Sequence, residues 1–336
     1  MKSLRKSKTF TGRAYELGLL REEFKKTETG ASFVTAYGRR RVGKTRLITE
    51  FYKDKNLWRF DGVEGQPKSF QIKNFLKQIS TYTGDQLYQS AACSTWIDLF
   101  KVLDKALLSK KMSPCTVFID ELPYMASRKT EIIAALKWAW DNLWQDRTGF
   151  TLVLCGSIAS FMVKKVIKSS SLYGRIRLEI RLLPLSIPEV FDFFGGKKSI
   201  REICDLYFFC GGIPEYLLQI DPTQSAALNM SRLALRKDGY FVGEFERLFK
   251  DIFQEEMIYK KIILLLSRHK NLKIPEITKH LGTSVGSGFT AYLENLELAG
   301  FVKSIVPLDK NDDSRLKRYR LDDEYLLFYV IILTGF

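Results

Sequence analysis

Residues 38–45 form the motif with the most specific chemistry in this chain. They read Gly38-Arg39-Arg40-Arg41-Val42-Gly43-Lys44-Thr45, a full match to the pattern G-x-x-x-x-G-K-[ST]. In that pattern backbone N–H groups surround a phosphate, the lysine reaches the β- and γ-phosphates, and the threonine hydroxyl ligates Mg²⁺. The sequence therefore predicts a phosphate-binding loop (P-loop) with Lys44 acting on phosphate and Thr45 on metal.

The residues on either side of this loop agree with the prediction. The run 32–37 before it is apolar and rich in β-branched and aromatic residues, which is typical of a buried strand. The run 46–52 after it has apolar residues at helical spacing. A strand, a glycine loop and a helix start place N–H groups and the positive end of a helix around one anion. A chance match in an ordinary loop is the less favoured alternative.

A second candidate element is the apolar run 116–119, which ends in Asp120 and Glu121. We expect Asp120 to hold Mg²⁺, commonly through a water molecule. If the strand pleat persists, Glu121 points away from Asp120 and is free to act as general base on the attacking water. Adjacent acidic residues also occur on solvated turns, but the preceding strand and P-loop favour catalysis. A general base at this position implies that the nucleotide is hydrolysed.

Two more candidates follow later strand-like runs. Ser157 comes after the run 151–155. It could contact the γ-phosphate or position water, and it could also cap the N-terminus of a helix; the two roles do not exclude each other. Arg175 ends the polar loop 169–175. It either faces phosphate charge, in its own or a neighbouring subunit, or is a surface arginine at a strand start. Both pairs of alternatives remain open at this point.

The order of these elements predicts the fold class. Strand-like runs alternate with helical patterns at 33–37, 57–61, 116–119, 151–155 and 176–183. Such alternation predicts an α/β P-loop NTPase, a three-layer sandwich with a mostly parallel five-stranded sheet. The carboxyl ends of parallel strands meet at one edge of the sheet, so we expect the P-loop, Asp120-Glu121 and Gly156-Ser157 to converge there.

The second half of the chain has a different pattern. Ser186 is expected to cap a helix, with Pro188 in its first turn and Glu189 three residues after the cap. Three helical patterns and two strand-like runs then predict a winged helix-turn-helix: 259–267, 274–282, 287–299, 301–306 and 316–321. We predict four parts: a P-loop core over 1–192, a helical lid over 193–256, the winged helix over 257–321 and a tail over 322–336.

The predicted winged helix has the charge of a DNA-binding module. Its third helix offers only Ser284, Ser287 and Thr290 for base contacts. The hairpin 303–320 is basic, with Lys303, Lys310, Arg315, Lys317, Arg318 and Arg320. We therefore expect phosphate contacts to dominate base recognition. The alternative is that the module packs on the ATPase core and contacts protein.

Composition limits the class of protein. The 336 residues leave room for about two domains, and 46% hydrophobic with 27% charged residues is typical of a globular protein. The net charge of +15 favours a polyanionic partner such as DNA or RNA, although a protein can be merely basic. Five scattered cysteines without a C-x-x-C pair, and two histidines, argue against zinc and favour a reducing, cytoplasmic setting. The longest apolar run, 325–336, is too short to span a bilayer, so we expect no membrane association.

Several motifs together resemble a known family. They are Phe10-Thr11-Gly12-Arg13, the arginine-rich P-loop, Phe118-Ile119-Asp120-Glu121, Leu172-Tyr173-Gly174-Arg175, Pro184-Leu185-Ser186 and Gly211-Gly212-Ile213-Pro214. The chain resembles the archaeal-type ATPases, AAA-like P-loop proteins of the STAND class. The resemblance implies ATP as the nucleotide, Arg13 near the adenine, Gly212 and Pro214 closing over the base, Ser157 as a sensor and Arg175 as the phosphate-facing arginine.

Two departures from the family pattern stand out. Position 14 is Ala14, where the family often has Glu, and many members continue into a nuclease-like domain where this chain ends at Phe336. The chain is therefore expected to be a short or truncated member. We expect a Mg²⁺-dependent ATPase that acts as a nucleotide-driven switch on DNA, with self-association left open. The alternative is a nucleotide-gated binding or scaffold protein with negligible hydrolysis, whose winged helix contacts protein.

Overall fold

The computed structural model describes residues 10–126, 131–252, 256–283, 287–309 and 316–333. The chain divides into two compact units. The sheet unit comprises Arg13–Gly38 and Lys44–Leu182, and the C-terminal unit comprises Met1–Gly12, Arg39–Gly43 and Leu183–Phe336. The middle of the P-loop therefore groups with the C-terminal unit, while both of its ends belong to the sheet unit.

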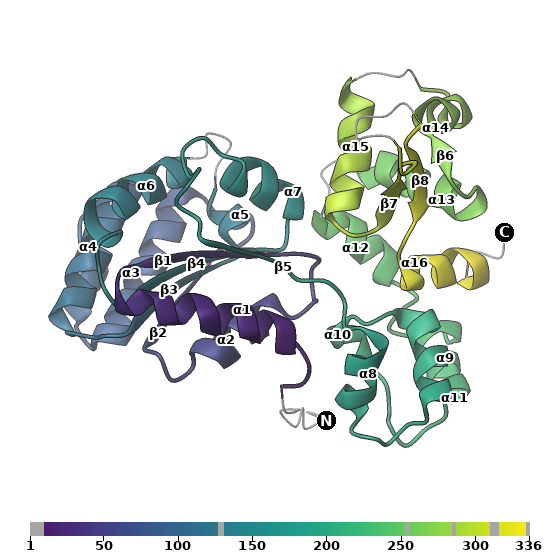
Figure 1. Ribbon diagram of the computed structural model, residues 1–336, viewed down its shortest axis with the longest axis horizontal. Coiled ribbons are helices and arrows are strands. Elements are labelled where there is room, and N and C mark those ends of the chain that lie inside the picture. The colour runs from purple at the N-terminus through teal and green to yellow at the C-terminus, as the bar shows by residue number, and fades with distance from the viewer. Residues whose placement is uncertain (1–9, 127–130, 253–255, 284–286, 310–315, 334–336) are drawn as a thin grey trace. The chain divides into compact units, whose positions relative to one another are not determined.

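The sheet unit is built on five strands. They are β1 (Ser32–Tyr37), β2 (Leu57–Asp61), β3 (Cys115–Asp120), β4 (Phe150–Gly156) and β5 (Leu178–Arg181). Their order in the sheet is β2-β3-β4-β1-β5, and the paired strands are parallel (Figure 1). The predicted α/β fold with a mostly parallel five-stranded sheet is confirmed.

Helices on both faces explain the apolar runs of the central strands. Strands β1, β3 and β4 are buried along almost their whole length, whereas the edge strand β2 alternates between buried and partly exposed residues. One face of the sheet is covered by α1 (Ala14–Lys25) and α2 (Lys44–Tyr52), and the other by α3 (Lys68–Thr83), α4 (Trp96–Ser109) and α6 (Glu131–Ala139) (Figure 1). The result is three layers.

The main core lies between the sheet and the second set of helices. The Phe60 ring on β2 stacks on Phe75 of α3 with 3.8 Å between ring centroids. Ile132, Leu136 and Trp140, which are spaced four residues apart along α6 and its continuation, are buried in this core. Short segments complete the unit: η1 (Lys26–Glu28), η2 (Gln86–Ser90), α5 (Leu122–Met125), η3 (Trp140–Trp144), α7 (Ala159–Phe161) and η4 (Met162–Ile167).

The C-terminal unit begins with a helical part. Its elements are α8 (Ile187–Phe194), α9 (Ile200–Cys210), α10 (Pro214–Leu217), α11 (Ala226–Met230), η5 (Ser231–Leu235) and α12 (Glu244–Ile252). The predicted start of α8 is confirmed, because the Glu189 carboxylate accepts hydrogen bonds of 2.9 Å from both the N–H and the hydroxyl of Ser186.

The rest of this unit combines helices with a small antiparallel sheet. The elements are α13 (Glu256–Arg268), β6 (Leu272–Lys273), α14 (Ile274–Leu281), α15 (Ser287–Leu298), β7 (Val302–Ile305), β8 (Arg318–Leu321), α16 (Glu324–Phe328) and η6 (Tyr329–Leu333). The strand order is β6-β8-β7, and β6 was not predicted. Helix α16 returns to α9, with the Phe328 ring 4.8 Å from that of Phe209. The four-part division of the chain stays a prediction.

No helix in the described ranges combines the length and the apolar character that crossing a membrane requires.

Candidate nucleotide-binding site

Lys44 opens helix α2 directly after the P-loop. Its side chain is buried, and its ammonium Nζ donates a hydrogen bond of 3.0 Å to the carbonyl of Gly38, where β1 ends. Gly38 has a φ of 147°, and a Cβ there would lie 2.3 Å from the carbonyl oxygen of Leu182, so only glycine fits. The lysine is thus held at the carboxyl edge of the sheet, as its predicted role requires.

Thr45 and Asp120 meet at this edge. The Thr45 hydroxyl donates a hydrogen bond of 2.7 Å to Asp120 Oδ2, and the other carboxylate oxygen accepts the Glu121 N–H at 3.0 Å. Asp120 ends β3 and is only 1% exposed. A hydroxyl and a carboxylate in contact form a set of hard oxygen donors, the chemistry that Mg²⁺ prefers. The two residues predicted to bind metal therefore fit a divalent cation.

Glu121 and Ser157 form a second contact of the site. Glu121 has a φ of 50°, so the strand pleat ends at Asp120 and the expected alternation does not continue. Its carboxylate accepts two hydrogen bonds from Ser157, from the N–H at 3.0 Å and the hydroxyl at 2.8 Å. Helix α7 begins at Ala159 with Ile158 as its N-cap, so the alternative that Ser157 caps a helix is wrong. Ser157 instead donates its hydrogen bonds to Glu121, the candidate general base.

Two charged residues that the sequence analysis missed lie beside Asp120. Arg59 and Asp61 are on β2, which pairs with β3. The Arg59 Nη2 atom is 3.1 Å from Asp120 Oδ2 and 2.5 Å from Asp61 Oδ1. The available signal was the pair of opposite charges at i and i+2 near the carboxyl end of a strand. Its relevance depended on β2 being the neighbour of β3.

Arg175 lies in an ion pair within the sheet unit. Its Nε and Nη2 atoms donate to the two carboxylate oxygens of Asp141 on η3, at 2.6 and 2.8 Å. The hydrogen bonds from Arg175, with a further one from Lys137, lower the pKa of Asp141 from 3.8 to about 2. The phosphate-facing role of Arg175 stays a prediction, and it would require this ion pair to break.

The P-loop arginines contact buried acidic residues of the C-terminal unit. Arg39 forms an ion pair with Asp323, donates to the Tyr216 hydroxyl at 3.3 Å and lies 4.8 Å from the centroid of the Phe301 ring. Both partners of the Arg39–Asp323 pair have side chains only 4% exposed. Sequence reasoning had assigned Arg39 to nucleotide binding alone.

Arg41 forms a similar contact two residues later. It pairs with Glu244 and donates to the Tyr240 hydroxyl at 3.2 Å. Burial, the largest single effect, lowers the pKa of Arg41, but the hydrogen bond to Glu244 and the attraction of its charge together outweigh burial and raise the pKa above its ordinary value. The Tyr216 hydroxyl also donates to Glu244, at 2.8 Å. The loop between Gly38 and Lys44 is therefore fixed by two charged contacts.

The remaining predicted nucleotide contacts lie on short turns. A Cβ on Gly43 would lie 3.7 Å from Pro214 Cγ, so the end of the P-loop adjoins the start of α10. Arg40 is half-buried and Val42 is buried, with its N–H donating to the Arg39 carbonyl at 3.4 Å. Arg13 precedes α1 and pairs with Glu16 at 3.3 Å. The adenine contacts expected of Arg13 and Pro214 stay predictions.

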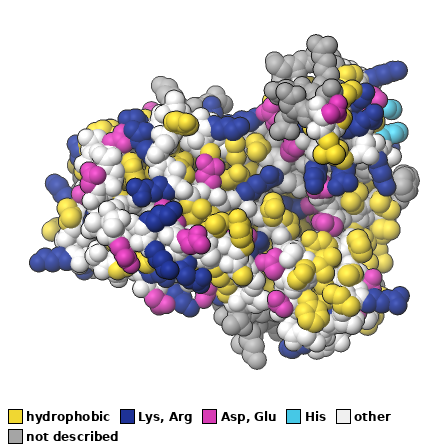
Figure 2. All heavy atoms as spheres, in the orientation of Figure 1, with side chains coloured by type: hydrophobic (Ala, Val, Ile, Leu, Met, Phe, Trp, Pro, Cys, Tyr) yellow, Lys and Arg dark blue, Asp and Glu magenta, His cyan; other side chains and the backbone are white. Residues whose placement is uncertain are grey.

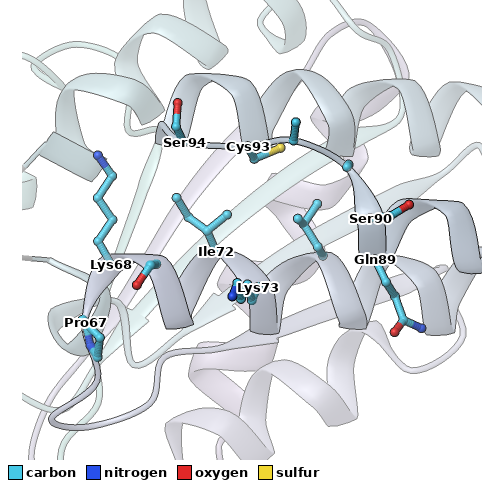
Figure 3. A pocket seen from close by; sticks show the side chains of 12 residues that line it. Pro67, Lys68, Ile72, Lys73, Gln89, Ser90, Cys93 and Ser94 are labelled. Carbon is cyan, nitrogen blue, oxygen red and sulfur yellow. The ribbon is translucent and has the colours of Figure 1, made fainter.

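A separate hollow of 690 Å³ lies on the sheet unit between α3 and residues 89–94. Ile72 lies at its floor, with Lys68, Lys73 and Cys93 around it (Figure 3). Among the described residues that line it, none belongs to the P-loop or to the ends of β3 and β4. This hollow is therefore distinct from the candidate nucleotide site.

Comparison with known proteins identifies the family. The model of an ATPase domain found predominantly in Archaea matches residues 10–220. The chain belongs to this family. An uncharacterized protein of Methanocaldococcus jannaschii is 28% identical to this ATPase over 321 residues, which is 95% of this chain and 68% of the relative. The site described above is thus the P-loop and acidic strand end of an archaeal-type ATPase.

Solved structures agree on the fold. The Walker-type ATPase PABY2304 of Pyrococcus abyssi is similar with a TM-score of 0.69 at 20% identity, covering 96% of each chain. The ORC2 protein of Aeropyrum pernix, solved as ADPNP–ADP complexes, has a TM-score of 0.55 at 16% identity, covering 96% of this ATPase and 93% of that chain. At these identities the similarity supports the P-loop ATPase fold.

Proposed function

We propose that this ATPase is a Mg²⁺-dependent, nucleotide-driven switch that acts on DNA. The proposal rests on two ion pairs, Arg39–Asp323 and Arg41–Glu244. They join the loop that would bind ATP phosphates to the start of α16 and to α12, so a change at the loop has a direct physical route into the C-terminal unit.

The chemistry follows from the residues at the sheet edge. Lys44 would neutralise the β- and γ-phosphates, and Thr45 and Asp120 would hold Mg²⁺, which supplies further charge neutralisation when bound. Glu121 would take a proton from the attacking water. Ser157 fixes the Glu121 carboxylate with two hydrogen bonds, and its own position after β4 is rigid because β4 is fully buried.

The switch follows from the charge of the loop. ATP brings several negative charges to a loop whose arginines already neutralise two acidic residues. If Arg39 turns to phosphate, Asp323 is left buried without its ion-pair partner, which costs on the order of 3–5 kcal/mol. If Arg41 turns to phosphate, Glu244 loses one arginine and keeps Arg247 at 3.4 Å, so the cost there is smaller. Nucleotide binding and the packing of α12 and α16 are therefore expected to be coupled.

The proposed DNA contact rests on charge and arrangement. The elements α13 to α15 with the small sheet β6-β8-β7 fit a winged helix-turn-helix. Lys303, Arg318 and Arg320 are exposed on β7 and β8, and Figure 2 shows Lys and Arg side chains gathered over this part. The predicted contacts Ser284, Lys310 and Arg315 lie outside the described residues. Phosphate contacts would give binding that weakens steeply with salt.

One experiment tests the proposal. Phosphate release from Mg-ATP is measured with and without duplex DNA for the wild type, Lys44→Ala, Glu121→Gln and the control Lys53→Ala. Lys53 is an exposed lysine that forms an ion pair with Glu50. We expect DNA to raise wild-type turnover, and Glu121→Gln to lower it about 100-fold or more while ATP still binds. Lys53→Ala should match the wild type. An ATP turnover rate that does not change when DNA is added, or a DNA affinity that does not change with salt concentration, would refute the DNA-coupled switch.

A second candidate is a nucleotide-gated binding protein with negligible turnover. It is favoured by the same Ser157 contact, because a carboxylate that already accepts two hydrogen bonds is restrained from reaching water. Tight ATP binding with no phosphate release in any condition would support this candidate and overturn the hydrolytic one.

A further inference from the structure

We propose that Arg59 is a built-in counter-ion of Asp120 that competes with the metal for this carboxylate. Cation binding then requires Arg59 to withdraw onto Asp61. The inference rests on the proposed function only in that Asp120 is taken as the metal-binding carboxylate. Arg59 is thus a positioning residue that acts through Asp120.

The register of the sheet places the three residues together. Asp61 pairs directly with Asp120 across β2 and β3, and Arg59 is two residues earlier on the same face of β2. The guanidinium contacts both carboxylates, with Nη2 3.1 Å from Asp120 Oδ2 and Nε donating to Asp61 Oδ1 at 2.8 Å. Asp120 Oδ2 is the same oxygen that accepts the Thr45 hydroxyl. Arg59 therefore contacts the oxygen that a cation would need.

Burial makes this contact consequential. The Asp120 side chain is 2% exposed, whereas the Arg59 side chain is 36% exposed. A charged carboxylate in so buried a place costs free energy unless a nearby positive charge or hydrogen bonds compensate for it. Arg59 supplies such a charge and is exposed enough to move when a metal supplies it instead.

The surroundings of Arg59 let its side chain move while its backbone stays fixed. The Tyr82 hydroxyl accepts the Arg59 N–H at 2.8 Å and donates to the Arg59 carbonyl at 3.2 Å. Asp61, whose side chain is 43% exposed, remains a partner when the guanidinium leaves Asp120. The Phe118 ring, 5.9 Å from the guanidinium carbon, provides a surface for the cation. Withdrawal thus needs only a rotation of the side chain.

The sign of the effect follows from like-charge repulsion. A divalent cation on Asp120 and a guanidinium on the same carboxylate repel each other, and at about 4 Å in a partly screened site this is worth on the order of one power of ten or more in affinity. Removal of the Arg59 charge should therefore tighten metal binding about tenfold or more. Removal of Asp61 should weaken it, because Arg59 then has Asp120 as its remaining carboxylate partner.

The test measures Mn²⁺ affinity by electron paramagnetic resonance, with a saturating non-hydrolysable ATP analogue present. The proteins are the wild type, Arg59→Gln, Asp61→Asn and the double variant, with circular dichroism to confirm folding. The control is Arg46→Gln, because Arg46 adjoins Thr45 in the chain but has a side chain 54% exposed and paired with Glu50. Arg59→Lys, which keeps a charge on a shorter donor, should fall between the wild type and Arg59→Gln.

The expected result is tighter Mn²⁺ binding in Arg59→Gln, weaker binding in Asp61→Asn, and little effect of the Asp61 change once Arg59 is gone. Equal or weaker binding in Arg59→Gln, with wild-type binding intact, overturns the inference and leaves the proposed metal site standing. If Asp61→Asn weakens Mn²⁺ binding as much without Arg59 as with it, the charge of Asp61 acts directly on the metal. This result also overturns the inference. If the wild type binds no Mn²⁺ with the nucleotide analogue, the proposed metal-dependent function fails instead.

Discussion

The stability of the C-terminal unit is expected to depend on the Arg39–Asp323 ion pair, by an amount that can be worked out from its burial. Both side chains are 4% exposed, so the variant Asp323→Asn removes the ion-pair partner of a buried guanidinium. Asp323 also accepts the Leu326 N–H at 2.8 Å as the N-cap of α16, and asparagine caps as well as aspartate does. The substitution therefore removes the charge while keeping the cap.

The magnitude follows from burial. Breaking a buried ion pair by removing one partner costs about 3–5 kcal/mol, and Arg39→Met, which keeps the packing on Phe301, should cost a similar amount. The double variant restores neutrality, so its cost should be smaller than the sum of the two by about 1–3 kcal/mol. The exposed pair Arg236–Asp238, with side chains 63% and 76% exposed, is the matched control. Its variants Arg236→Met and Asp238→Asn should cost less than about 1 kcal/mol each.

The assay is native-state hydrogen exchange of peptides from α9 and α16, because two units need not unfold as one. A loss of about 3 kcal/mol raises the exchange rate of protected amides roughly 100-fold, since each 1.4 kcal/mol is a factor of ten. If the costs of Arg39→Met and Asp323→Asn add to within about 0.5 kcal/mol, the two charges do not interact. The proposed route from the P-loop into the C-terminal unit would then be wrong.

Three further predictions concern single contacts. The pKa of Asp141 is lowered to about 2, so the stabilisation from its pair with Arg175 should be complete above pH 3.8 and lost as the pH falls through 2. In Arg175→Ala, an NMR titration should find the pKa of Asp141 raised toward its ordinary value. An unchanged pKa would contradict the pairing. Gly212→Ala should destabilise the C-terminal unit by more than about 3 kcal/mol in hydrogen-exchange measurements, because a Cβ there would lie 1.8 Å from the backbone carbonyl oxygen of Leu185. A cost below about 1 kcal/mol would show that the two backbone segments do not approach so closely. Ser157→Ala should lower ATP turnover roughly tenfold with ATP affinity almost unchanged, because Glu121 loses its hydroxyl donor, whereas a rise in turnover would favour a restraining role.

Short-range patterns were enough to predict much of this ATPase. The strand before the P-loop, the glycines of the loop and the acidic end of β3 are local features, because they depend on residues that are close in sequence. The capping of α8 by Ser186 and Glu189 is local for the same reason. The convergence of Thr45 and Asp120 was also predictable, since parallel strands share their carboxyl edge.

The contacts that the sequence did not predict depend on a backbone turn or on a distant partner. Glu121 was expected to continue the pleat of β3, but its left-handed φ turns the carboxylate to Ser157. Arg39 was assigned to phosphate alone, and its acidic partner Asp323 is 284 residues away along the chain. The sequence left open whether Arg175 faces phosphate or the surface, and its ion pair with Asp141 on η3 was not predicted. None of these partners follows from spacing.

The sequence by itself determined the class of this protein, because the P-loop and the acidic strand end are contiguous stretches whose chemistry needs no distant partner. Only the tertiary structure decided which charges meet. Arg59 reaches Asp120 because β2 lies next to β3 in the sheet, an order that the linear alternation of strands and helices leaves open. Arg39 and Arg41 reach Asp323 and Glu244 because the chain folds back on its own P-loop. Buried ion pairs depend on such long-range packing, since a charge is stable in the interior only where the fold brings its partner.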